Sequence, residues 1–198
     1  MGSSACDGNV ALETREFPWD GDKNLRVYGP AELHFRAAEH WRLQVQGSPE
    51  LLDKLLIGGG QIGFKPGANV FHVGRLHIEL SGPALEQLVL EGSTSALLEG
   101  LNQSILVVEV RGSSIVHGTG SVYQVSVGIA GSGSADLTGM SAATARISVL
   151  GSGNADLSPS DAVSVTICGS GNVRLHTRPA KVESNITGSG KVILVGAP

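Results

Sequence analysis

The sequence is poor in charged residues and lacks long apolar runs, and both shortages exclude classes of protein. Only 16% of its 198 residues are charged, and the formal net charge is −4. Nucleic acid binding requires a basic patch or stripe, so we expect no nucleic acid partner. A membrane-spanning helix needs about 20 consecutive apolar residues, and no stretch of the sequence provides them.

Cysteine is scarce, and the N-terminus lacks the charged and then apolar pattern of a signal peptide. Cys6 and Cys168 form neither a CxxC pair nor a metal motif, so we predict no metal site and no cofactor. Met1 to Ser4 resemble a cloning remnant, which favours an exported protein whose signal has been removed. We expect residues 1–8 to be a disordered tail or such a remnant. Membrane contact would then come only through an unseen signal or a lipid anchor at Cys6.

Glycine, by contrast, is abundant, with 28 residues, and 41% of the chain is hydrophobic. A chain with this much apolar surface offsets its conformational entropy, which excludes general disorder. The β-branched segments between clusters of Gly, Ser and Asn instead indicate many short strands joined by tight turns.

The second half of the chain contains a repeat. Two degenerate copies begin at Gly92 and Gly112, and the first glycines of the six copies lie 20, 19, 20, 18 and 19 residues apart. Four copies align without gaps: Gly131-Ser132-Gly133-Ser134-Ala135-Asp136-Leu137, Gly151-Ser152-Gly153-Asn154-Ala155-Asp156-Leu157, Gly169-Ser170-Gly171-Asn172-Val173-Arg174-Leu175 and Gly188-Ser189-Gly190-Lys191-Val192-Ile193-Leu194.

Apolar residues alternate with small or polar ones on both sides of each turn. Val127 and Ile129 precede the copy at Gly131, and Ala135 and Leu137 follow it. Period-two alternation indicates a strand with one buried face. A unit of about 19 residues is too short for a strand and a crossover helix, so each unit must stack on the next. The sequence therefore predicts an all-β fold, a right-handed parallel β-helix with rungs of about 19 residues, with a β-sandwich or propeller as the alternatives.

The first 80 residues have a different character, because seven of the eight aromatic residues fall there. Residues 25–35 read as an irregular version of the strand, turn, strand unit. Residues 48–55 predict one short helix, with Ser48 as the N-cap and Pro49 at the first helical position. We expect residues 9–80 to form an irregular, aromatic-rich N-terminal cap and residues 81–198 to form the repeat β-helix, both within one continuous domain.

The cap and the repeat together resemble a known family. The later Gly-Ser-Gly-Asn copies are similar to the repeated core of the bacterial GIN domain, also described as an autotransporter adhesin head domain. The segments similar to its opening are Gly8-Asn9-Val10, Glu13-Thr14-Arg15-Glu16-Phe17, Val27-Tyr28-Gly29-Pro30-Ala31-Glu32-Leu33, and Gly47-Ser48 with Glu50-Leu51-Leu52-Asp53-Lys54-Leu55. The resemblance covers the chain from about residue 8 to the end. It implies a β-helical fold and a bacterial cell-envelope or exported location, and it implies no catalytic residues.

Equivalent positions of a parallel β-helix form columns about 4.8 Å apart. The outward column five residues after each turn glycine reads Leu97, His117, Asp136, Asp156, Arg174, Ile193. Two adjacent carboxylates repel each other, so the pKa of one could be raised. His117, Asp136, Asp156 and Arg174 are therefore a candidate binding column for a cation or a glycan. The alternative is a solvated ladder of complementary charges.

Two tryptophans form a second candidate surface. Trp19 and Trp41 would stack on sugars if they are exposed, and would pack in the cap if they are not.

Three functions from different classes remain open. The first is a non-enzymatic, adhesin-like protein of the periplasm or outer surface that binds a polysaccharide or a protein partner. The second is a polysaccharide-binding or -degrading enzyme that uses the His/Asp/Asp/Arg column. The third is a structural module that assembles with its own copies through the last rung, where Val192 and Leu194 lie.

Overall fold

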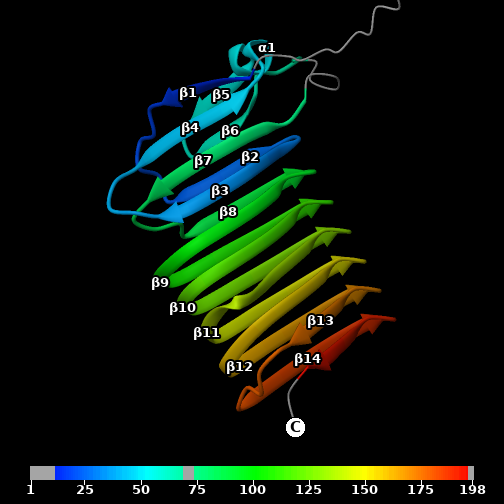
Figure 1. The fold of residues 1–198 in the computed structure, drawn as a ribbon. Helices are drawn as coiled ribbons and strands as arrows, with labels where there is room; N and C mark the ends of the chain where they lie inside the picture. Colours follow the sequence, from blue (N-terminus) through cyan, green and yellow to red (C-terminus); the bar gives the residue numbers. More distant parts are fainter. Residues whose placement is uncertain (1–11, 69–73, 196–198) are drawn as a thin grey trace, which may run out of the picture.

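In the computed structural model, which describes residues 12–68 and 74–195, strands stack rung upon rung along one axis (Figure 1). Of these described residues 72% lie in strands and 3% in a helix, and together they form a β-solenoid of about five turns. This architecture confirms the predicted all-β fold and parallel β-helix. The expected tail at residues 1–8 lies outside the described residues.

One continuous sheet wraps around the solenoid and presents two broad faces. Face 1 begins with four strands from the N-terminal segment, and the first halves of β9 to β12 continue it. Its strands in spatial order are β1 (Glu13–Phe17), β4 (Arg42–Gly47), β7 (Leu76–Gly82), β3 (Ala31–Ala37), β9 (Ser95–Gly112), β10 (Ile115–Gly131), β11 (Ser134–Gly151), β12 (Asn154–Gly169), β13 (Asn172–Leu175) and β15 (Lys191–Leu194).

Face 2 contains the second halves of β9 to β12, which have passed through the corner of the solenoid. The remaining strands of face 2 are β5 (Leu55–Gly58), β6 (Gln61–Phe64), β2 (Asn24–Tyr28), β8 (Gln87–Gly92) and, at the C-terminal end, β14 (Lys181–Gly188). The two faces meet at the turn glycines, which connect face 2 to face 1 in every rung.

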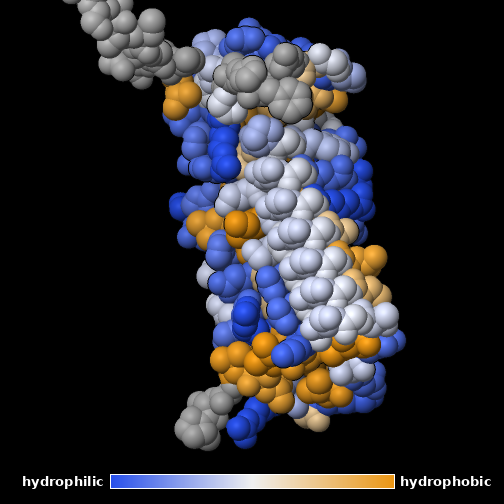
Figure 2. All heavy atoms as spheres, turned by 90° about the vertical axis from the view of Figure 1, so that its right-hand side faces the viewer, coloured by the Kyte–Doolittle hydropathy of each residue, from blue (hydrophilic) through white to orange (hydrophobic). Residues whose placement is uncertain are grey.

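The turn residues form a continuous pale band along one edge of the molecule (Figure 2). In this band the backbone N–H of each turn serine donates to the carbonyl oxygen of the turn glycine one rung earlier, as Ser132 does to Gly112 at 3.0 Å and Ser152 to Gly131 at 3.0 Å. Gly131 has φ +124°, and a Cβ there would lie 2.6 Å from the oxygen of Gly112. Glycine is therefore required both for the turn and for the close approach of the rungs.

The predicted alternation is confirmed in the core. Val127 and Ile129 before the turn, and Ala135 and Leu137 after it, are all 1% exposed. The equivalent side chains of the neighbouring rungs lie directly above and below them in the parallel register. Each column of Val, Ile, Leu or Ala is thus a continuous apolar ladder inside the solenoid.

The N-terminal end is closed by elements that do not repeat. The predicted helix is present as α1 (Pro49–Asp53), and Ser48 Oγ accepts a hydrogen bond from the Leu51 N–H at 3.3 Å. Strands β1 and β4 pair antiparallel, as do β4 and β7, whereas the repeat pairs are parallel. Strands β2 and β3 already stack in parallel on β8 and β9, so the solenoid begins within residues 9–80.

We predict that Gly131→Ala lowers the free energy of unfolding by about 1 to 3 kcal/mol, because the new Cβ is strained at positive φ and collides with the rung before it. Gly128→Ala is the matched control, since a Cβ there meets only Glu109 Cγ at 3.9 Å and φ is not positive. Urea unfolding of both variants checks this. Equal stability of the two would contradict the role assigned to the turn.

Candidate functional site

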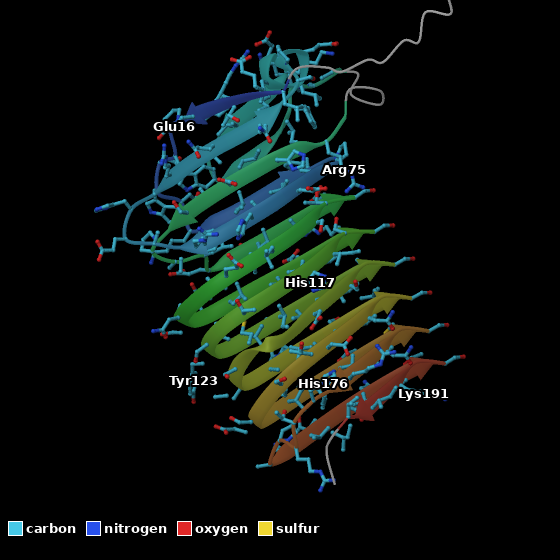
Figure 3. The ribbon with its side chains drawn as sticks, in the orientation of Figure 1. Glu16, Arg75, His117, Tyr123, His176 and Lys191 are labelled. Carbon is cyan, nitrogen blue, oxygen red and sulfur yellow. The ribbon has the colours of Figure 1, made fainter. Side chains whose placement is uncertain are left out.

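The register brings the predicted column together. His117 pairs with Leu97 and Asp136, Asp136 pairs with Asp156, and Asp156 pairs with Arg174 on successive strands of face 1. We call His117, Asp136, Asp156 and Arg174 the charged row. Its side chains lie on the outer surface of the sheet (Figure 3 labels His117).

Each aspartate of the charged row has its own partners. His117 Nδ1 lies 3.5 Å from Asp136 Oδ2, while Arg174 Nη1 lies 3.4 Å from Asp156 Oδ2. His176 lies near the row as well, with its Nε2 atom 3.0 Å from Asp156 Oδ1 (Figure 3). The two carboxylates therefore have separate partners, Asp136 on the strand before and Asp156 on the strand after.

Hydrogen bonds determine the direction in which the pKa of Asp136 is shifted. Partial burial opposes ionisation, but the Thr138 hydroxyl donates to Oδ1 at 2.7 Å, the Thr138 N–H donates at 3.1 Å, and His117 adds a favourable charge. Together they hold the pKa of Asp136 below its ordinary value. The sequence left open which carboxylate of the row would have a raised pKa, and it is not Asp136, because its hydrogen-bond donors outweigh the effect of burial.

The column of outward side chains continues beyond the charged row toward the N-terminus, further than the sequence placed it. Leu97 pairs with His34, His34 with Glu79, and Glu79 with Gln44. His34 stands five residues after Gly29, the same offset that defines the column in the repeat. Applying that offset to the irregular first rung would have identified His34 as a member of the column. Glu79 and Gln44 lie on strands with no repeat signal, so the sequence offered no means of placing them.

Histidine–carboxylate contacts recur on face 1. His34 Nε2 lies 2.6 Å from Glu99 Oε2, and this hydrogen bond lowers the pKa of Glu99. His77 Nδ1 lies 3.0 Å from Glu32 Oε2. Among the described residues no group of three or more His, Cys, Asp or Glu side chains is placed to hold a metal ion.

Two hollows in face 1 share His34 and Glu79. One has a volume of about 320 Å³ and is also lined by Arg36, Arg42 and Gln44 across strands β3, β4 and β7. The other has a volume of about 310 Å³ and lies toward β9. We call the two together the His34–Glu79 groove. Neither hollow is lined by a residue of the charged row.

Two polar side chains that line the groove have no protein partners. Within residues 12–68 and 74–195, neither the Glu79 carboxylate nor the Gln44 amide makes a hydrogen bond or an ion pair. The flanking cations are already paired, Arg36 with Glu99 at 3.4 Å and Arg42 with Glu16 at 3.3 Å. The groove therefore combines one free carboxylate and one free amide with guanidinium groups held in place.

The two tryptophans lie together in the cap. The Trp19 and Trp41 ring centroids are 6.3 Å apart, Trp19 Nε1 donates to the Asp22 carbonyl at 3.1 Å, and Trp41 also contacts Phe35. Both rings are half-buried against the hydrophobic core. Stacking of a sugar on their exposed edges stays a prediction.

The family model described as "Putative auto-transporter adhesin, head GIN domain" matches residues 23–198. The chain belongs to this family. The match confirms the resemblance seen in the sequence and begins after the segment at Glu13–Phe17. A search of curated protein sequences finds no relative of the chain.

Solved structures from Bacteroides and Parabacteroides species share the fold. A "putative adhesin" from Bacteroides fragilis has a TM-score of 0.71 at 14% identity, over 94% of this chain and 97% of that one. A "putative adhesin" from Parabacteroides distasonis gives 0.61 at 17% identity, over 96% and 98%. A "putative lipid binding protein" from the same species gives 0.59 at 18%, also over 96% and 98%. At sequence identities this low, the comparison shows that the fold is shared and says nothing about function. No helix among the described residues is both long and apolar enough to cross a membrane.

We predict that Asp136→Asn lowers the free energy of unfolding at pH 7 by less than about 1 kcal/mol, since the carboxylate is half exposed. Because the folded pKa is below the ordinary value, the ionised group stabilises the fold above pH 3.8, and this contribution disappears as the pH falls through the folded pKa. The difference between wild type and variant should therefore vanish in more acidic solution.

Urea unfolding at pH 7 and near pH 2 tests this, with Asp20→Asn as the control for loss of one exposed negative charge. A stability difference that grows on acidification would contradict the assigned direction.

Proposed function

We propose that this protein is a non-enzymatic binding module of the adhesin type, secreted or held in the bacterial cell envelope, and that its ligand is a polysaccharide. The His34–Glu79 groove is its primary site. The observation that carries the proposal is the free Glu79 carboxylate and the free Gln44 amide in the lining of a hollow that Arg36 and Arg42 also line. Family membership supports the adhesin class and the location.

The groove has the hydrogen-bonding capacity that a sugar requires. A sugar hydroxyl donates one hydrogen bond and accepts others. The Glu79 carboxylate accepts only, the Arg36 and Arg42 guanidinium groups donate only, and the Gln44 amide does both. Such a set satisfies adjacent hydroxyls without a net charge on the ligand, because the groove carries both signs.

The charged row continues the same face beyond the groove. Successive strands are about 4.8 Å apart, so a chain of several sugar units that leaves the groove past Leu97 would next meet His117 and Asp136. We therefore assign the row a secondary role, which only a long polymer would use.

The alternative of a degrading enzyme has less support. A general acid needs a pKa raised toward the working pH, whereas the pKa of Asp136 is lowered. The row also lies outside both hollows of the groove, so a scissile bond over Asp136 and Asp156 would not be enclosed by them.

The test is binding to a panel of bacterial and host polysaccharides by wild type, Glu79→Gln and Gln44→Ala. We expect each variant to bind about 5- to 10-fold more weakly, because each loses one or two hydrogen bonds to the ligand. The matched controls are Glu109→Gln and Gln124→Ala on face 2, which should bind like wild type. Equal affinity of all five proteins would contradict the assignment of the groove.

The double variant Asp136→Asn/Asp156→Asn separates the row from the groove. We expect it to weaken the binding of a long polymer and to leave a short oligosaccharide unaffected. Release of new reducing ends by the wild type, lost in the double variant, would contradict the non-enzymatic function and favour the enzyme.

A further inference from the structure

The last rung of the solenoid consists of β14, the turn at Gly188 and β15, and we call it the C-terminal rung. Its inward positions continue the core ladders, because Val182 pairs with Val163, Ile186 with Ile167, and Leu194 with Leu175. The apolar pattern of a buried rung thus reaches the final turn, with one polar interruption at Ser184, which pairs with the buried Val165.

These side chains nevertheless remain exposed. Val182 is 42%, Ile186 40% and Leu194 56% exposed, whereas Val163 is 3% and Ile167 0%. An apolar area is visible at this end of the molecule (Figure 2). Among the described strands, β14 pairs with β12 alone and β15 with β13 alone, so each also presents an unpaired hydrogen-bonding edge. A solenoid end of this kind requires a cover.

The opposite end of the molecule is closed. Leu51 and Leu52 of α1 are buried over the first rungs. The edge strand β1 is polar, and Arg15 forms ion pairs with Glu13 at 3.0 Å and Asp53 at 2.7 Å. Head-to-tail stacking of one copy on the next would bury these charges, so the N-terminal end of a second copy is a poor partner for the C-terminal rung.

The C-terminal rung is complementary to itself. When two copies of β14 pair antiparallel about Ser184, Val182 of one copy lies opposite Ile186 of the other, on the inward side. On the outward side Glu183 faces Asn185, and Lys181 faces Thr187, so no like charges meet. A shift of the two-fold axis by one residue places Val182 opposite Ser184 and loses the apolar contact.

We propose that the protein forms a closed, two-fold symmetric dimer in which the C-terminal rungs of two copies pair edge to edge through β14. Each rung supplies the missing neighbour of the other, and the apolar ladders run continuously through both copies. The interface is isologous, so it closes at two copies and leaves both His34–Glu79 grooves free at the far ends. This dimer is independent of the ligand proposed for the groove.

Sedimentation velocity over the micromolar range tests the assembly. We expect wild type to approach twice the 20.3 kDa mass of the chain and Ile186→Lys to dissociate at least tenfold more readily. The matched control is Leu150→Lys on face 2, a 58% exposed leucine whose replacement should leave the dimer intact. A monomeric wild type, or masses that grow beyond two copies, would overturn the proposal.

A disulfide crosslink tests the register in which the two copies of β14 pair. In a background with Cys6→Ser and Cys168→Ser, Ser184→Cys should form an intermolecular disulfide, because directly opposed residues of antiparallel strands lie within disulfide range. Thr187→Cys, which faces Lys181 of the other copy, should not. Crosslinking at residue 187 but not at 184 would show that the two-fold register is wrong.

Discussion

The rest of the structure depends on how closely one turn of the chain can lie on the next. At each turn the serine N–H reaches the glycine carbonyl of the rung before it, and a Cβ on the turn glycine would occupy that space. The contact repeats from Gly92 to Gly188 and aligns the strands on both sides of every turn. A slip of one residue in any rung would move its apolar side chains to the outer surface, so the core enforces the same register.

This constraint explains the arrangement of polar side chains on face 1. Once the rungs are in register, outward residues with the same offset from the turn must form a row, whether or not they have a function. Selection can then act on one position per rung. In the repeat the row became a set of complementary pairs, His117 with Asp136 and Asp156 with Arg174. Near the cap the same column includes Glu79 and Gln44, which have no protein partners among the described residues.

The repeat part and the cap part of this column differ because the strands that carry them pair differently. In the repeat every pairing is parallel, with register shifts after the charged row, such as those between Gly118 and Gly120 and between Leu137 and Ser141. In the cap β4 enters antiparallel next to β7, and hollows form where Arg42, Gln44 and Glu79 meet His34. The cap is thus more than a cover for the core, since its irregular strands create the concave part of face 1.

The repeating features of the fold could be predicted from the sequence, and so could the short helix α1, whereas the remaining strands of the cap could not. The spacing of the turn glycines and the alternation around them predicted the β-helix, the buried ladders and the charged row. The capping pattern at Ser48 and Pro49 predicted α1. The antiparallel insertion of β4, and with it the groove, depends on contacts between Arg42–Gly47 and Leu76–Gly82 that no periodicity encodes. The direction of the Asp136 pKa shift depends on the Thr138 donors, whose orientation the strand pattern does not reveal.

The register between the cap and the repeat is the central claim, because it creates the row and places the groove. It is tested most directly by disulfide formation between two cysteines introduced at His34 and Leu97, in a chain without Cys6 and Cys168. These positions are 63 residues apart in sequence and are direct neighbours on β3 and β9, within the distance that a disulfide spans. The account predicts rapid, complete crosslinking of the 34/97 pair and little crosslinking when the second cysteine replaces Ser95 instead. Preferential crosslinking of the 34/95 pair would show a register shifted by two residues and would contradict the account.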